Sequence, residues 1–149
     1  MAIPPLHTLS HLFNDEDACT SFLFSHEIFY PLQQRPRCGS PMNLQLTQGV
    51  FQCPHHGCRA ARSIRKGSFF ASHKLPCSKI LFMGYLWLTK TPSSAITAMT
   101  GHSKHTVANF LLYFRQLIAS HLDEDDTRIG GPGIIVEVDE AVMHSHHIN

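Results

Sequence analysis

The stretch between residues 31 and 73 constrains the fold more than any other part of the chain, because prolines and glycines interrupt it every few residues. They are Pro31, Pro36, Gly39, Pro41, Gly49, Pro54, Gly57 and Gly67. A long helix or strand cannot run through such a series of breaks. Between them, the pieces NLQLT and VFQC alternate polar and apolar residues, which is typical of short strands. We therefore predict a small module of strands and turns.

Cysteines with the spacing of metal ligands lie in this module. Cys53 and Cys58 enclose the turn PHHG, and Cys38 lies upstream on an expected facing turn. A zinc ribbon closes a tetrahedral site with four cysteine or histidine ligands from two such knuckles. The bound ion also supplies folding free energy that a small core cannot. The spacing predicts a degenerate zinc ribbon over residues 35–75.

The first knuckle of this ribbon is one ligand short. Arg35 stands where a second cysteine is expected, four positions into the sequence LQQRPRC. His55 or His56 could complete the site, although both lie inside the second knuckle, where joint coordination with its two cysteines is awkward. The alternative is that the three cysteines are ordinary free thiols. Cys19 and Cys77 are expected to be core or surface thiols.

Helices are expected on both sides of the ribbon. Residues 1–34 predict a helical lead-in, in which Asn14 or Asp15 caps a helix running through residues 18–26. Residues 76–122 predict three helices. The first, SKILFMGYLWLTK, follows Pro76 and is apolar nearly all round, so we expect it to be buried.

The second and third helices of this unit have recognisable ends. The second lies in TPSSAITAMTG, with Thr91 or Ser93 as its cap and Gly101 at its end. The third begins after the cap Ser103 and carries an apolar stripe, and polar residues occupy the opposite face. The stripe consists of Val107, Phe110, Leu111, Phe114, Leu117, Ile118 and Leu122, and the polar face of His105, Asn109, Tyr113, Gln116 and Ser120.

A helix, a short helix, a glycine-containing turn and a longer helix with a polar outer face are the layout of a helix-turn-helix DNA reader. The alternative is a plain three-helix bundle. If the unit reads DNA, the candidate contacts lie at the start of the third helix, and they are Lys104, His105, Thr106 and Asn109.

Basic residues also follow the second knuckle, in RAARSIRKGSFF. The candidates for phosphate contacts are Arg59, Arg62, Arg65 and Lys66. The alternative is a solvated edge of the ribbon. Because the formal net charge is only +1, any binding to nucleic acid must depend on such local patches.

Composition indicates a folded protein, with 43% hydrophobic and 15% charged residues. The start MAIPPLHTLSHLF lacks the pattern of a signal peptide. The longest apolar run, ILFMGYLWL, is about half of what a bilayer span needs. We expect a soluble intracellular protein with no membrane partner. The five cysteines are then metal ligands or free thiols rather than a disulfide framework.

A set of motifs in a fixed order resembles the transposases of the Merlin superfamily, the eukaryotic relatives of a bacterial insertion-sequence group. The motifs are PRCGSPM, FQCPHHGC, SIRKGSFF with KLP following, YLW, MTGHSKHTV, FRQLIA and IGGPGIIVEVDEA. The resemblance covers the chain from about Leu9 to Ala141. It implies a zinc ribbon and a helix-turn-helix that bind double-stranded DNA at transposon ends, followed by an RNase H-like catalytic domain of the DDE type.

Composition and pattern predict the last part of the chain as an acidic, glycine-rich linker over residues 123–133, DEDDTRIGGPG, followed by the short strand IIVEV. The resemblance implies that residues 134–149 hold the first strand of the catalytic domain. Asp139, with Glu140 beside it, matches the first of three acidic residues that hold two divalent ions, Mg²⁺ or Mn²⁺, in the family. One carboxylate cannot position two metal ions for strand cleavage. At about Val142 the sequence departs from the family pattern and reads AVMHSHHIN.

The complete prediction is an α+β chain made of a zinc-ribbon-like β module, a three-helix unit and the first strand of a truncated RNase H-like domain. We expect a transposase-derived DNA-binding protein, a truncated or frameshifted copy that does not cleave or join DNA. The alternatives are a non-functional transposon relic, an interaction module without enzymatic role, and a nuclease completed by another chain. His144, His146 and His147 either bind a transition metal or form a solvated end. The family implies a nuclear location, and the sequence leaves the oligomeric state open.

Overall fold

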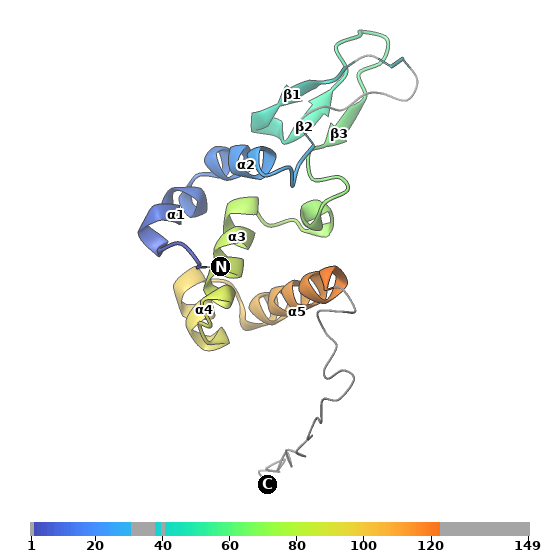
Figure 1. Cartoon of the computed structure of the whole chain (residues 1–149). Helices are drawn as coiled ribbons and strands as arrows, with labels where there is room; N and C mark the ends of the chain where they lie inside the picture. The colour runs from blue at the N-terminus through green and yellow to red at the C-terminus, as the bar shows by residue number, and fades with distance from the viewer. Residues whose placement is uncertain (1, 31–37, 40, 123–149) are drawn as a thin grey trace, which may run out of the picture.

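A computed structural model describes residues 2–30, 38, 39 and 41–122 of the chain (Figure 1). Within these residues the fold is α+β, with five α-helices and a small antiparallel sheet of three strands. The predictions for Arg35, the linker, the strand with Asp139 and the histidines near residue 146 fall outside the described residues. None of the described helices is both long enough and apolar enough to cross a bilayer.

The helical lead-in consists of two helices, α1 (Leu6–Asn14) and α2 (Glu16–Ser25), rather than one. Asp15 separates them in an extended conformation. Its carboxylate accepts hydrogen bonds from the backbone N–H groups of Asp17, at 3.0 Å, and Ala18, at 3.2 Å. This confirms Asp15, one of the two predicted caps, because its side chain satisfies donors that the first turn of α2 leaves unpaired.

The sheet lies at one end of the molecule, next to α2 (Figure 1). Its strands are β1 (Asn43–Gln45), β2 (Val50–Gln52) and β3 (Ala61–Ser63), in the order β1-β2-β3. Phe51, at the centre of β2, pairs with Leu44 on one side and Arg62 on the other, and its side chain is buried. The two segments predicted as strands from their alternation are therefore confirmed.

The three-helix unit consists of α3 (Cys77–Leu88), α4 (Ser93–Thr100) and α5 (Lys104–His121). Gly101 ends α4 in the left-handed region, with φ of 73°. Ser103 caps α5 by accepting a hydrogen bond from the backbone N–H of Thr106. Both features were predicted. The predicted side-chain cap of α4 is wrong, because Pro92 occupies the N-cap position and offers no acceptor.

The apolar stripe of α5 is buried only along its first half. Val107, Phe110, Leu111 and Phe114 lie in the core. Leu117, Ile118 and Leu122 are 36%, 42% and 49% exposed, so the predicted stripe continues beyond the core. The cause is helix length: α5 has 18 residues, whereas α3 has 12 and α4 has 8. The last turns of α5 border an apolar groove of about 760 Å³ shared with α2 and α3.

One hydrophobic core joins the sheet, the lead-in and the three-helix unit. A chain of aromatic rings, called here the aromatic chain, passes through it from β2 to α3. Its members are Phe51, Phe24, Phe29, Phe70, Phe69, Phe114 and Trp87, and the centroids of successive rings lie 6.2, 5.5, 5.7, 5.6, 5.8 and 5.7 Å apart. These separations are within the range of attractive aromatic pairs. The ribbon is therefore packed onto the helices and does not stand apart from them.

Candidate metal centre and DNA-contacting surfaces

The second knuckle is a turn between β2 and β3. The backbone N–H of Cys53 donates to the carbonyl oxygen of Ala60 at 2.9 Å, which continues the pairing of these two strands. Inside the turn, the carbonyl oxygen of His55 accepts hydrogen bonds from the N–H groups of Cys58, at 3.0 Å, and Arg59, at 3.2 Å. These bonds fold the segment back, so that Cys58 returns to the side of Cys53.

Cys38 lies in the facing turn, ahead of β1. Its Sγ atom is 3.9 Å from the Sγ atom of Cys53, and the Sγ atoms of Cys38, Cys53 and Cys58 all lie within 4.8 Å of one another. Two thiolates on one tetrahedral Zn²⁺ are about 3.8 Å apart, because each Zn–S bond is about 2.3 Å long. The three cysteines that were predicted as ligands can therefore hold a metal ion.

The three thiols differ in their surroundings. Cys53 is buried, Cys58 is half-buried and Cys38 is exposed. The side-chain hydrogen bond with Cys58 raises the pKa of the Cys53 thiol, whereas the backbone hydrogen bond from His55 lowers it; burial and Cys38 add to the increase. Without a metal ion, the Cys53 thiol is therefore held in its protonated form. Because a metal ion binds cysteine as the thiolate, metal binding should release protons.

The two histidines of the knuckle do not join the thiols. Both His55 and His56 are exposed, and neither belongs to the group of ligand atoms that the described residues bring together. They line a hollow of about 460 Å³ that also borders Cys53. The other residues that line the hollow are Asn43, Gln45, Gln52, Pro54 and Arg59. The structure thus places three donors at the site and a polar hollow beside it.

The predicted DNA-contacting residues of α5 lie in its first turns. Lys104 and His105 are exposed, and Thr106 and Asn109 are half-buried. The amide nitrogen of Asn109 is 3.1 Å from Nε2 of His105, one turn away. Thr106 is tied to the cap, with its hydroxyl 2.9 Å from that of Ser103. His105 and Asn109 lie on the side of α5 opposite its buried residues, whereas Lys104 and Thr106 lie at the two borders of that side.

The four basic residues of the ribbon do not share one environment. Arg59 and Lys66 are exposed, whereas Arg62 in β3 is half-buried. Arg65 points inward: its Nη1 donates to the carbonyl oxygens of His73, at 2.8 Å, and Leu75, at 2.7 Å. The structure therefore gives Arg65 a structural role, and Arg59 and Lys66 are better placed for phosphate contacts.

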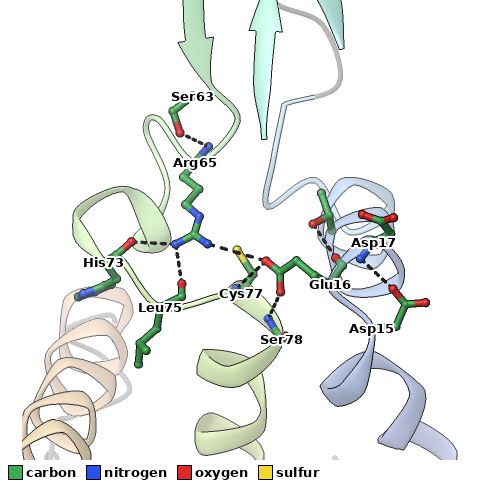
Figure 2. A network of polar contacts seen from close by, with 10 residues as sticks. Asp15, Glu16, Asp17, Ser63, Arg65, His73, Leu75, Cys77 and Ser78 are labelled. Atoms are coloured by element: carbon green, nitrogen blue, oxygen red, sulfur yellow. Dashed lines mark hydrogen bonds and ion pairs between the residues drawn. The ribbon is translucent and has the colours of Figure 1, made fainter. Parts of the chain in front are cut away.

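Arg65 belongs to a network that sequence reasoning missed (Figure 2). Its Nη2 lies 3.8 Å from the carboxylate of Glu16, in the first turn of α2. That carboxylate accepts hydrogen bonds from the backbone N–H groups of Cys77 and Ser78, each at 2.8 Å. Glu16 therefore caps α3 from another helix. The only sequence signal was Pro76, which leaves the start of α3 without a side-chain acceptor of its own.

The two remaining cysteines lie in the core and are not part of the metal site. Cys19 and Cys77 are both buried, and burial is the largest cause that raises the pKa of each thiol to about 12. At neutral pH both are protonated core thiols, one of the two environments that the sequence allowed.

Comparison with known proteins adds no relative. No protein family, no curated protein and no solved structure matches this chain. The resemblance to Merlin transposases therefore stays a prediction that depends on the ordered motifs.

Proposed function

We propose that this chain is a transposase-derived protein that binds double-stranded DNA through its three-helix unit, with a zinc-stabilised ribbon beside it. The observation that carries the proposal is the arrangement of α4 and α5. A left-handed glycine turn separates a short helix from a longer one, and the longer helix is buried along one side and exposes polar residues on the other. A helix presented in this way fits the major groove of B-DNA.

The start of α5 combines two kinds of contact. Lys104, in the first turn, offers a cation for phosphate oxygens, and the helix N-terminus adds its partial positive charge. Asn109 carries an amide, which can pair with an adenine edge in the major groove. Lys104 would thus position the helix on the backbone, whereas Asn109 would read sequence.

The ribbon supports the helices. Zn²⁺ fits the three thiols because it accepts thiolate ligands and because the distance between the Sγ atoms of Cys38 and Cys53 matches tetrahedral geometry. A bound ion would fix the two knuckles to each other and so stabilise a sheet whose strands are only three residues long. Arg59 and Lys66, both exposed, would add phosphate contacts.

Catalysis is not part of the proposal. Asp139 is an active-site residue only by resemblance, and it lies outside the described residues. Strand cleavage by the family requires three carboxylates and two divalent ions, so Asp139 alone carries no proposal about catalysis. The proposed function is the binding of DNA by the described residues.

The test is the affinity of the full chain for a fluorescent DNA duplex, measured by anisotropy over a series of salt concentrations. Lys104→Ala should weaken binding about three- to tenfold for all sequences and lower the salt slope by about one. Lys79→Ala is the matched control. It also removes an exposed lysine from the first turn of a helix, but that helix is α3 and not α5.

Equal loss in the two variants would refute α5 as the DNA-contacting helix. Metal content is measured on the same samples. If the chain holds no metal and shows no salt-dependent binding, the proposal fails and the transposon-relic interpretation takes its place.

A further inference from the structure

The metal site has three protein donors where a closed zinc site has four. Among the described residues, the thiols of Cys38, Cys53 and Cys58 form the group of donors that lie within 4.8 Å of one another. The neighbouring residues 31–37 and 40 have the sequences PLQQRPR and S, which contain no cysteine, histidine or acidic residue. The first knuckle therefore contributes one ligand and the second contributes two.

A three-donor zinc site keeps one position for a ligand from outside. Structural zinc sites are closed by four protein ligands, whereas sites with three protein ligands carry an exchangeable fourth one. The burial of the thiols agrees with the second kind, because Cys38 is exposed and Cys58 is only half-buried. A small molecule from solution can therefore approach the ion.

The surroundings select the kind of molecule. Cys53 borders the polar hollow of about 460 Å³, and amide side chains and Arg59 also line it. Amide N–H groups and an exposed guanidinium favour an anion. Three thiolates make a soft ligand set, which favours a fourth sulfur donor over a carboxylate.

We infer that the metal bound by Cys38, Cys53 and Cys58 takes a small anionic thiol as its fourth ligand, with the acidic group of that thiol in the hollow near Arg59. The inference depends on the metal binding proposed above. The step is a ligand exchange: the thiol releases its proton to the buffer, its sulfur donates an electron pair to the metal, and the bound water leaves. No electrons are transferred to or from the metal.

The experiment uses the full chain loaded with Co²⁺, whose absorption reports the number of bound thiolates. Equilibrium dialysis first measures cobalt binding. Mercaptoacetate is then titrated, and the sulfur-to-cobalt charge-transfer absorbance should rise by roughly one third, because four thiolates replace three. Mercaptoethanol, which has no carboxylate, should give the same final spectrum at a higher concentration.

Two variants separate the role of Arg59 from general charge. Arg59→Ala should weaken mercaptoacetate binding about two- to fivefold, as expected for an exposed ion pair, and should leave mercaptoethanol unchanged. Lys66→Ala, which removes another exposed cation of the ribbon, should change neither. Equal effects of the two substitutions would overturn the assignment of the hollow.

The remaining outcomes distinguish the inference from the proposed function. If cobalt binds but neither thiol changes its spectrum, the site is closed and the inference fails, while metal binding stands. A fourth ligand from the chain itself is tested by two sets of alanine substitutions. One replaces His55 and His56 together, and the other replaces His144, His146 and His147 together. A fall in cobalt affinity in either variant would identify a fourth protein ligand and would overturn the inference. If cobalt does not bind at all, both the inference and the metal part of the proposed function fail.

Discussion

Replacing Glu16 by alanine should destabilise the whole described fold, although Glu16 lies on the lead-in helix α2. Its carboxylate accepts hydrogen bonds from the N–H groups of Cys77 and Ser78. Both of these residues are buried, at 1% and 4% exposure, so water cannot fully replace the lost acceptor. Pro76, at the N-cap of α3, supplies no side-chain acceptor in its place.

The size of the effect follows from these contacts. A hydrogen bond to a charged group contributes about 1.5–3 kcal/mol, and there are two of them. The Glu16 side chain is 41% exposed, which reduces the value of each bond, and the contact with Arg65 at 3.8 Å adds about 0–1 kcal/mol. We expect Glu16→Ala to lower the free energy of unfolding by about 2–4 kcal/mol. Glu16→Gln keeps one acceptor oxygen and should cost about half as much.

Urea unfolding followed by the fluorescence of Trp87 measures this change, because Trp87 is the only tryptophan and its half-buried ring stacks on the core residue Phe114. Asp17→Asn is the matched control: Asp17 is an exposed acidic residue of the same first turn, and its substitution should change stability by less than about 0.5 kcal/mol. If Glu16→Ala costs no more than Asp17→Asn, the inter-helix cap does not stabilise α3 and the reasoning is wrong.

Three further predictions concern single side chains. Alkylation of the native chain at pH 8 without metal should modify Cys38 rapidly and leave Cys19 and Cys77 unmodified, since burial raises the pKa of both to about 12; peptide mass spectrometry would contradict this if all three react at similar rates. Burial, followed by the charge of Arg65, lowers the pKa of His73, so the unfolded chain takes up the proton at a higher pH than the folded chain. The stabilisation present above a pH of about 6.5 should therefore be lost as the pH falls below that value. This loss of stability should be absent in His73→Phe, and identical pH profiles of stability for the two proteins would exclude it. Asn109→Ala should relax base preference at one position of a selected DNA site by about 1–3 kcal/mol without changing the salt slope, and a uniform loss across sequences would instead make Asn109 a backbone contact.

Local patterns in the sequence predicted the features that depend on local chemistry. The strands around Phe51 follow from alternation, the cap at Ser103 and the turn at Gly101 follow from residue type, and the approach of Cys38 to the second knuckle follows from spacing. The cap and the turn span only a few positions, so neighbouring residues determine them. The strand pairing and the approach of Cys38 to Cys53 span up to 15 positions, all within one small module.

The features that the sequence did not reveal depend on distant residues. Glu16 and Cys77 are separated by 61 positions, and no periodicity connects a carboxylate in one helix with the first turn of another. The exposure of Leu117 was equally hidden, because it depends on how far α5 extends beyond its shorter neighbours. Arg65 was grouped with the surface cations because it lies among other basic residues in the sequence. Only its hydrogen bonds to the carbonyl oxygens of His73 and Leu75 show its structural role.

The aromatic chain has a consequence for how this unit can be inherited. Phe51 comes from the ribbon, Phe24 and Phe29 from the lead-in, and Trp87 from α3, so each part supplies packing that the others require. A recombination event that moved only residues 76–122 into another protein would leave behind Glu16, Arg65 and much of the surface on which the helices rest. The three-helix unit therefore cannot be transferred on its own, and evolution would have to keep or lose the ribbon, the lead-in and the three helices as one piece.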